Sequence, residues 1–220
     1  HMKAGEIAVA KAKESAATQH LNQLEPEEAA HLSRVLRDLG DEAEGVGGTE
    51  YYALARVCFE SMHRYRVFAY GPGDARTLTA INRVALLELK TNNNAEAFDL
   101  LSTVHEARSV LFGAGHPKLF STHWHLGVCL WRLGRRNEAV VHKREAWLIE
   151  VSDEGILAEE VLETAELLVT DCCELGNQEM VAEVRDRIHA AVLEAKELSP
   201  AQQEWLHKID AIVFPPRDLL

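Results

Sequence analysis

The sequence has no long apolar run and few aromatic residues. Only 6% of its 220 residues are aromatic, although 47% are hydrophobic. No stretch approaches the roughly 20 consecutive apolar residues that a helix needs to span a bilayer, and no signal-peptide pattern opens the chain. The abundance of Ala, Leu and Glu favours a largely helical protein. We therefore expect a helical protein in the cytoplasm (an intracellular protein) that neither spans nor binds a membrane.

Basic residues are also in the minority. The chain has 23 Lys and Arg against 35 Asp and Glu, which gives a net charge of −12. Nucleic-acid-binding proteins rely on Lys and Arg to displace counterions, so this charge argues against nucleic acid as a partner. The charge is also uneven, because residues 62–152 have a net charge of about +4 and residues 153–210 one of about −11. The acidic segment is either a solvated cap or part of a dipolar surface that orients a charged ligand.

The four cysteines show no metal-binding spacing. Cys58, Cys129, Cys172 and Cys173 form no C-x-x-C pair, and all four lie in apolar stretches. We therefore expect reduced, buried thiols. Neither Cys172 nor Cys173 has the histidine and basic neighbours that would activate a nucleophilic cysteine.

Helical patterns and short turns alternate along the chain, and no segment has the pattern of a strand. Pro26 opens the first helix and Gly45–Gly48 ends it. The connections are short, which is typical of antiparallel helix hairpins. We expect helices over residues 26–45, 49–69, 75–92, 95–112, 118–134 and 138–151, a further pair divided near 174–178, and a last short helix over 200–212.

A period of 42 residues is the strongest internal pattern. Ala55, Ala97 and Ala139 follow one another at this spacing, and the turn at Gly71–Ala75 returns at Gly113–Pro117. Small residues at fixed points let neighbouring helices approach closely, and a hairpin cannot bury its apolar face without its neighbours. The period therefore predicts an all-α solenoid of antiparallel hairpins that ends in a C-terminal capping helix.

The expected organisation has three parts. His1-Met2 has the look of an expression-tag scar, so residues 1–25 are expected to hold that scar and a leading helix or flexible segment. Residues 26–212 form the helical repeat domain, and residues 213–220 form a C-terminal tail.

The two clearest copies of the repeat, over about residues 70–151, resemble tetratricopeptide repeats of the long, kinesin-light-chain type. His116-Pro117 matches the turn that opens the first helix of such a repeat, and Ala80–Ala85 matches the middle of that helix. Glu96-Ala97 and Glu138-Ala139 match the start of the second helix. The resemblance implies a right-handed α-solenoid that acts as a protein–protein interaction module or scaffold.

Three histidines, His116, His123 and His125, lie within ten residues. His116 stands where Asp74 stands one repeat earlier, which predicts a helix-capping role. His123 and His125 point about 200° apart on a helix, whereas metal-binding helices use spacings of three or four residues. His123 takes the place of Ile81, a core position, so we expect it to be packed and hydrogen-bonded. The sequence therefore predicts no metal site.

The sequence likewise shows no clear pattern of catalytic residues. Glu159, Glu160 and Glu163 share a helix face, but carboxylates on an acidic helix are usually solvated surface. The glycines of the inter-helix turns do not follow a strand, so they do not predict a phosphate-binding loop. We therefore expect neither enzymatic activity nor a cofactor.

The resemblance implies that side chains of the first helix of each repeat line a concave groove. Trp124 and Trp131 lie seven residues apart on one helix face and are of a type that dominates binding hot spots, although both could instead pack between helices. The amide of Asn82 either forms hydrogen bonds with the backbone of a bound peptide or makes a local hydrogen bond within the repeat. The expected occupant is a peptide or protein segment with acidic and apolar residues. The residues expected to contact it are Asn82, Arg83, Leu89, Lys90, Trp124, His125, Trp131 and Arg132.

Two other functions stay open beside the interaction module. The chain could be the C-terminal helical region of a multidomain enzyme, because SET-MYND-type lysine methyltransferases have similar repeats, and a SET motif upstream would decide this. It could also be a ligand-responsive repeat sensor, which a ligand-induced rise in heat stability would indicate. The sequence does not name the partner, the source organism or the oligomeric state.

Overall fold

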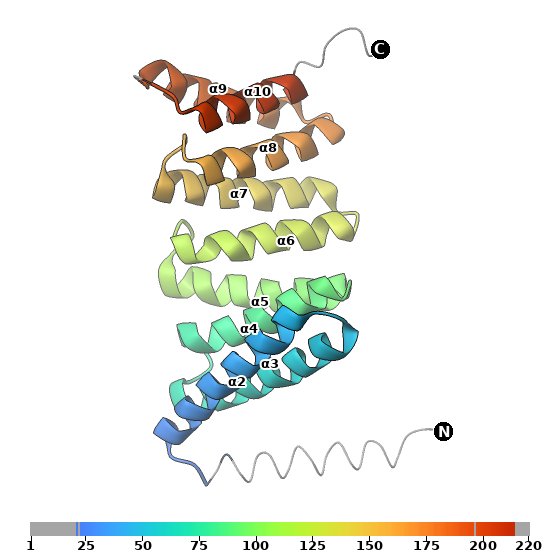
Figure 1. Cartoon of the computed structure of the whole chain (residues 1–220), viewed down its shortest axis with the longest axis vertical. Coiled ribbons are helices and arrows are strands. Elements are labelled where there is room, and N and C mark those ends of the chain that lie inside the picture. Colours follow the sequence, from blue (N-terminus) through green and yellow to red (C-terminus); the bar gives the residue numbers. More distant parts are fainter. Residues whose placement is uncertain (1–20, 22, 196, 214–220) are drawn as a thin grey trace, which may run out of the picture. The chain divides into compact units, whose positions relative to one another are not determined.

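The computed structural model in Figure 1 describes residues 21, 23–195 and 197–213. Within these residues the chain forms nine α-helices and one short 3-10 helix, without a strand. The helix ends agree with the expected ones to within three residues. The expected N-terminal segment and C-terminal tail lie almost entirely outside the described residues. The helices are α2 (Pro26–Val46), α3 (Thr49–Tyr70), α4 (Ala75–Lys90), α5 (Asn94–Phe112), η1 (Pro117–Leu119), α6 (Phe120–Arg132), α7 (Arg136–Glu154), α8 (Glu159–Glu174), α9 (Gln178–Glu194) and α10 (Pro200–Val213).

The chain divides into two compact units, residues 1–93 and 94–220. In the first unit α3 packs against both α2 and α4. Phe59 and Met62 of α3 are fully buried. A Cβ atom at Gly40 of α2 would lie 2.4 Å from Cε1 of Phe59. This glycine therefore allows α2 to lie directly against the phenyl ring of α3.

In the second unit α5, α6, α7 and α8 lie side by side in chain order (Figure 1). Helix α10 returns to pack against α8 and buries Ile209 in the core of this unit. It is therefore the C-terminal capping helix that the sequence predicted. The core consists of Val140, Trp147, Val161, Leu162, Ala165, Leu168, Val169, Cys172, Val181, Val184, Ile188 and Ile209.

The 42-residue period is visible in the turns. Gly71, Gly113 and Gly155 follow α3, α5 and α7, and their φ angles are 88°, 88° and 90°. Glycine adopts this backbone conformation without the steric cost that other residues bear. The turns after α4, α6 and α8 show the same period, with positive φ at Asn92, Gly134 and Gly176.

The alanine series marks close helix packing in both units. Ala55, Ala97 and Ala139 are all completely buried. A larger side chain has no space at such a point without a shift of a neighbouring helix.

None of the described helices has the length and apolar composition needed to cross a membrane.

Candidate interaction surface

The expected contact residues of the first unit all lie on α4. Asn82 and Leu89 are buried, with 7% and 6% of their surface exposed. The Oδ1 atom of Asn82 accepts no hydrogen bond from any described residue. Asn82 therefore does not cap a bond within the described part of the chain.

The two cations expected on α4 already have acidic partners on α2. Arg83 pairs with Asp41 and Glu44, and Lys90 Nζ pairs with the same Glu44. The ring of Phe59 lies 4.9 Å from the Arg83 guanidinium, in cation–π range. A partner carboxylate would have to compete with these internal pairs.

The expected contact residues of the second unit lie on α6. Trp124, His125 and Trp131 are half-buried, and Arg132 at the end of the helix is exposed. The side chain of His125 is held by its own helix, because Nδ1 donates a hydrogen bond to the carbonyl oxygen of Ser121. Burial lowers the pKa of His125 below its ordinary value, and this hydrogen bond opposes the shift in part.

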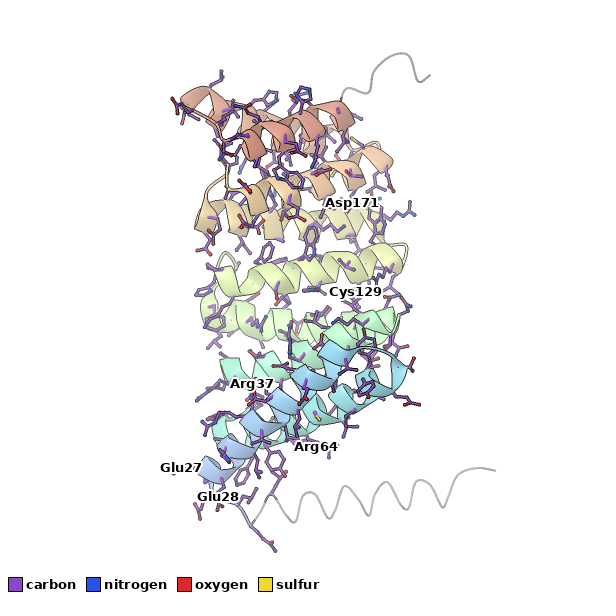
Figure 2. All side chains as sticks on the ribbon, viewed as in Figure 1. Glu27, Glu28, Arg37, Arg64, Cys129 and Asp171 are labelled. Carbon is purple, nitrogen blue, oxygen red and sulfur yellow. The ribbon has the colours of Figure 1, made fainter. Side chains whose placement is uncertain are left out.

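A buried lysine joins the two tryptophans. The ammonium group of Lys143 on α7 lies 5.2 Å from the Trp124 ring and 5.3 Å from the Trp131 ring. The same ammonium group pairs with Asp171 of α8, which is labelled in Figure 2. Only 10% of the Lys143 side chain and 15% of the Asp171 side chain are exposed. The two rings thus share one face of α6, as expected, and this face is tied to α7 and α8.

Gly127 provides the space through which Lys143 passes. A Cβ atom at Gly127 would lie 2.6 Å from Cγ of Lys143 and 3.1 Å from the backbone oxygen of Ala139. Ala85 occupies the equivalent position one repeat earlier. The change from alanine to glycine is the sequence feature that indicates this close crossing of α6 and α7. Lys143 itself was not among the residues expected from the sequence.

Arg136 extends the surface at the end of α6. Its guanidinium lies 4.9 Å from the Trp131 ring. We use the name tryptophan surface for Trp124, Trp131, Arg136 and Lys143, which these ring contacts connect, together with Arg132, which follows Trp131 in the chain. It combines aromatic area with cations, which matches the residue types enriched at protein interfaces.

His116 and His123 have hydrogen-bond partners outside the tryptophan surface. His116 caps η1, because its Nδ1 accepts a hydrogen bond from the backbone nitrogen of Lys118 at 3.1 Å, as the sequence predicted. His123 is buried and hydrogen-bonded, also as predicted, and its partners are His105 and His142. His123 turns opposite ring nitrogens toward these partners, so the three rings do not converge on one point. The described residues contain no group of three or more metal-ligand side chains placed to hold an ion.

The thiols are not activated as nucleophiles. Burial raises the pKa of Cys129 to about 11 and that of Cys172 to about 12. Burial also raises the pKa of Cys58 and of Cys173. Because the thiolate is the reactive form, these shifts act against nucleophilic reactivity of the four cysteines at neutral pH.

The comparisons with known proteins agree with this architecture. Residues 76–146 match the family model of the tetratricopeptide repeat. One similar solved structure is a crystal structure of nearly identical tetratricopeptide-like repeats, in a form with one substitution, from a putative kinesin light chain of Podosopora anserina. It is 16% identical to this chain and matches it with a TM-score of 0.65. The match covers 86% of this chain and 87% of the other chain.

A second structure of those Podosopora anserina repeats is also 16% identical, covers 86% of this chain with 96% of its own length, and has a TM-score of 0.62. The search of curated proteins found no match. At this identity the two structures show a shared fold. The family match covers residues 76–146, and the two structures show that the chain shares the all-α solenoid fold of tetratricopeptide-like repeats.

Proposed function

We propose that the protein is a scaffold-type interaction module of the cytoplasm, without catalytic activity, that holds a segment of another protein against the tryptophan surface. Tetratricopeptide repeats generally mediate protein–protein interaction, which supports the class of function. The observation that carries the proposal is the pair of half-buried tryptophans around Lys143. Half-buried aromatic side chains that are already held in place lose little conformational freedom when a partner covers them.

The proposed occupant carries apolar and acidic side chains. Apolar groups cover Trp124 and Trp131, while carboxylates meet Arg132 and Arg136, which are both exposed. Lys143 contributes little net charge because Asp171 neutralises it. On α4 the same holds for Arg83 and Lys90, whose charges Asp41 and Glu44 offset. The Arg136 guanidinium lies 4.9 Å from the Trp131 ring, so the acidic groups of the occupant are proposed to lie beside that ring.

The test compares two tryptophans that have similar structural surroundings. Trp131 on α6 and Trp205 on α10 are both partly buried against the same core, and each has a cation over its ring. Trp131→Ala is expected to weaken partner binding by at least about 2 kcal/mol, whereas Trp205→Ala leaves it unchanged. Partners captured from the source organism are identified by mass spectrometry, and the purified partner is then titrated by calorimetry against each variant.

The salt concentration separates the ionic contribution of Arg132 from the apolar contribution of Trp131. Arg132→Ala is expected to weaken binding at low salt and to have little effect near physiological ionic strength, where the Debye length is about 8 Å. Trp131→Ala weakens binding at every salt concentration. If Trp131→Ala folds normally and binds as tightly as the wild type, the tryptophan surface is not the binding site.

A further inference from the structure

Three histidines from three successive helices form a row in the second unit. His105 lies on α5, His123 on α6 and His142 on α7. The Nε2 atoms of His105 and His123 are 3.2 Å apart, and so are the Nδ1 atoms of His123 and His142. The ring centroids are 4.5 Å apart in the first pair and 5.3 Å in the second. Two hydrogen bonds between imidazoles therefore connect three helices.

Two of the three histidines of the row are particular to this repeat. The positions 42 residues before and after His123 hold Ile81 and Ala165, and those around His142 hold Leu100 and Val184. The neighbouring repeats thus fill these two positions with apolar side chains, whereas the position of His105 holds His63 in the preceding repeat and Trp147 in the following one. The helices can pack without imidazoles at the positions of His123 and His142, so the fold does not require these two members of the row.

The hydrogen count of the row limits how many protons it can bind. Four ring nitrogens face one another in two contacts, and each contact needs one N–H group and one bare nitrogen. The two outer nitrogens, Nδ1 of His105 and Nε2 of His142, can carry one hydrogen each. The row therefore holds at most four hydrogens with both bonds intact. Three neutral rings carry three hydrogens, so one added proton is accepted and a second breaks a hydrogen bond.

The charged groups around the row act on its two outer rings. Glu106 of α5 favours the charged form of His105. Glu138 and Glu145 of α7 favour the charged form of His142, whereas Arg135 opposes it. Arg135 also holds both carboxylate oxygens of Glu138 at 2.7 Å. Among the groups that act on His123, no carboxylate is present.

We infer that His105, His123 and His142 form a pH-sensitive latch that holds α5, α6 and α7 together and opens when the row binds a second proton. In the closed state the rings are neutral or share one proton. In the open state two imidazolium rings face each other across a helix contact, and that contact separates. His123 directly precedes Trp124 in α6, so opening of the latch changes the tryptophan surface; this consequence rests on the proposed function, whereas the latch itself does not.

The pKa values give the direction of the switch. Burial, then His105 and His142, lower the pKa of His123 from its ordinary 6.5 to about 4. Burial is also the main cause that lowers the pKa of His105 and of His142. A histidine with a lowered pKa in the folded state binds fewer protons than the unfolded chain. The stability that the closed latch contributes is therefore complete above pH 6.5 and declines as the pH falls from that value toward about 4.

Amide hydrogen exchange tests the latch without a binding partner. After correction for intrinsic exchange rates, the opening constant of α6 is expected to rise on the order of 10-fold for His123 alone between about pH 7.5 and about pH 5. The double variant His123→Ile and His142→Leu uses residues found at the equivalent positions of the preceding repeat. It is expected to lose most of this pH dependence. His31→Gln, at an exposed position of α2, is the control and should behave as the wild type.

A second measurement covers the case in which the double variant does not fold. Nitrogen-15 NMR of the wild-type imidazoles reports the protonation of each ring. The latch predicts that at least one ring of the row stays neutral well below pH 6.5. Three rings that titrate independently near 6.5, or a double variant with the wild-type pH dependence of α6 exchange, would overturn the proposal. A normal latch with no partner at the tryptophan surface would instead count against the proposed function alone.

Discussion

Replacing Gly127 by alanine adds one methyl group at the crossing of α6 and α7. The new Cβ atom would lie 2.6 Å from Cγ of Lys143, a separation that real Cβ atoms essentially never show. Lys143 cannot swing aside without loss, because its ammonium group pairs with Asp171 and lies near two aromatic rings. The backbone oxygen of Ala139, at 3.1 Å, restricts the other side. Either the lysine or the helix must therefore move.

The expected cost follows from two opposing contributions. Overpacking of a close contact typically costs about 1–3 kcal/mol. Replacing a helical glycine by alanine recovers roughly 0.5–1 kcal/mol, because the unfolded chain loses conformational freedom. We expect Gly127→Ala to lower the free energy of unfolding by about 1–2 kcal/mol. In a chain of this size that corresponds to roughly 2–8 °C in the melting temperature, measured by circular dichroism.

Gly45→Ala in α2 is the matched control. Gly45 is also helical, and a Cβ atom there would meet nothing within 4 Å. Its substitution should raise stability by up to about 1 kcal/mol. Adding Lys143→Ala to Gly127→Ala should restore part of the lost stability, because the Lys143 Cγ atom that the new Cβ atom meets is then absent. If Gly127→Ala stabilises the protein as much as Gly45→Ala does, the reasoning about this crossing is refuted.

Two further substitutions test the repeat. Ala97→Leu places a large side chain at a completely buried position and should cost about 1–3 kcal/mol in thermal unfolding; an unchanged melting temperature would show that the alanines do not mark close packing. Asp74→Ala removes the cap of α4, where the carboxylate accepts a hydrogen bond from the Arg76 backbone nitrogen at 2.8 Å, and should cost about 1 kcal/mol at neutral pH. The Arg76 side chain lowers the pKa of Asp74 from 3.8 to about 2, so in urea titrations the wild-type advantage should be complete above pH 3.8 and fade as the pH falls toward 2; a difference that does not change with pH would contradict the charge-assisted cap.

The sequence predicts the helices well because local chemistry determines where they end. Gly71, Gly113 and Gly155 must each adopt a positive φ, and this requirement places glycine at a 42-residue spacing that is visible in the letters alone. The caps at Asp74 and His116 are local in the same sense, since each side chain bonds a backbone nitrogen two residues ahead. Such features need no knowledge of the partner helix.

Contacts between helices are much harder to predict. The histidine row joins residues that lie 18 and 19 positions apart, and Lys143 meets Asp171 across 28 positions. Sequence proximity instead drew attention to His116 and His125, which take no part in the row. Only the glycine at position 127 carried a signal, because a residue smaller than Ala85 at an equivalent position implies a larger neighbour.

The same limitation changes how the charged residues contribute to binding. From the sequence, Arg83 and Lys90 are cations on one helix, and nothing nearby reveals that Glu44, 46 residues before Lys90, neutralises them. A partner carboxylate that replaces Glu44 exchanges one ion pair for another, so it gains little net energy. Discrimination between partners must then come from groups without an equivalent internal substitute. The remaining exposed area of Trp124 and Trp131 meets this condition, because its desolvation occurs only when a partner binds.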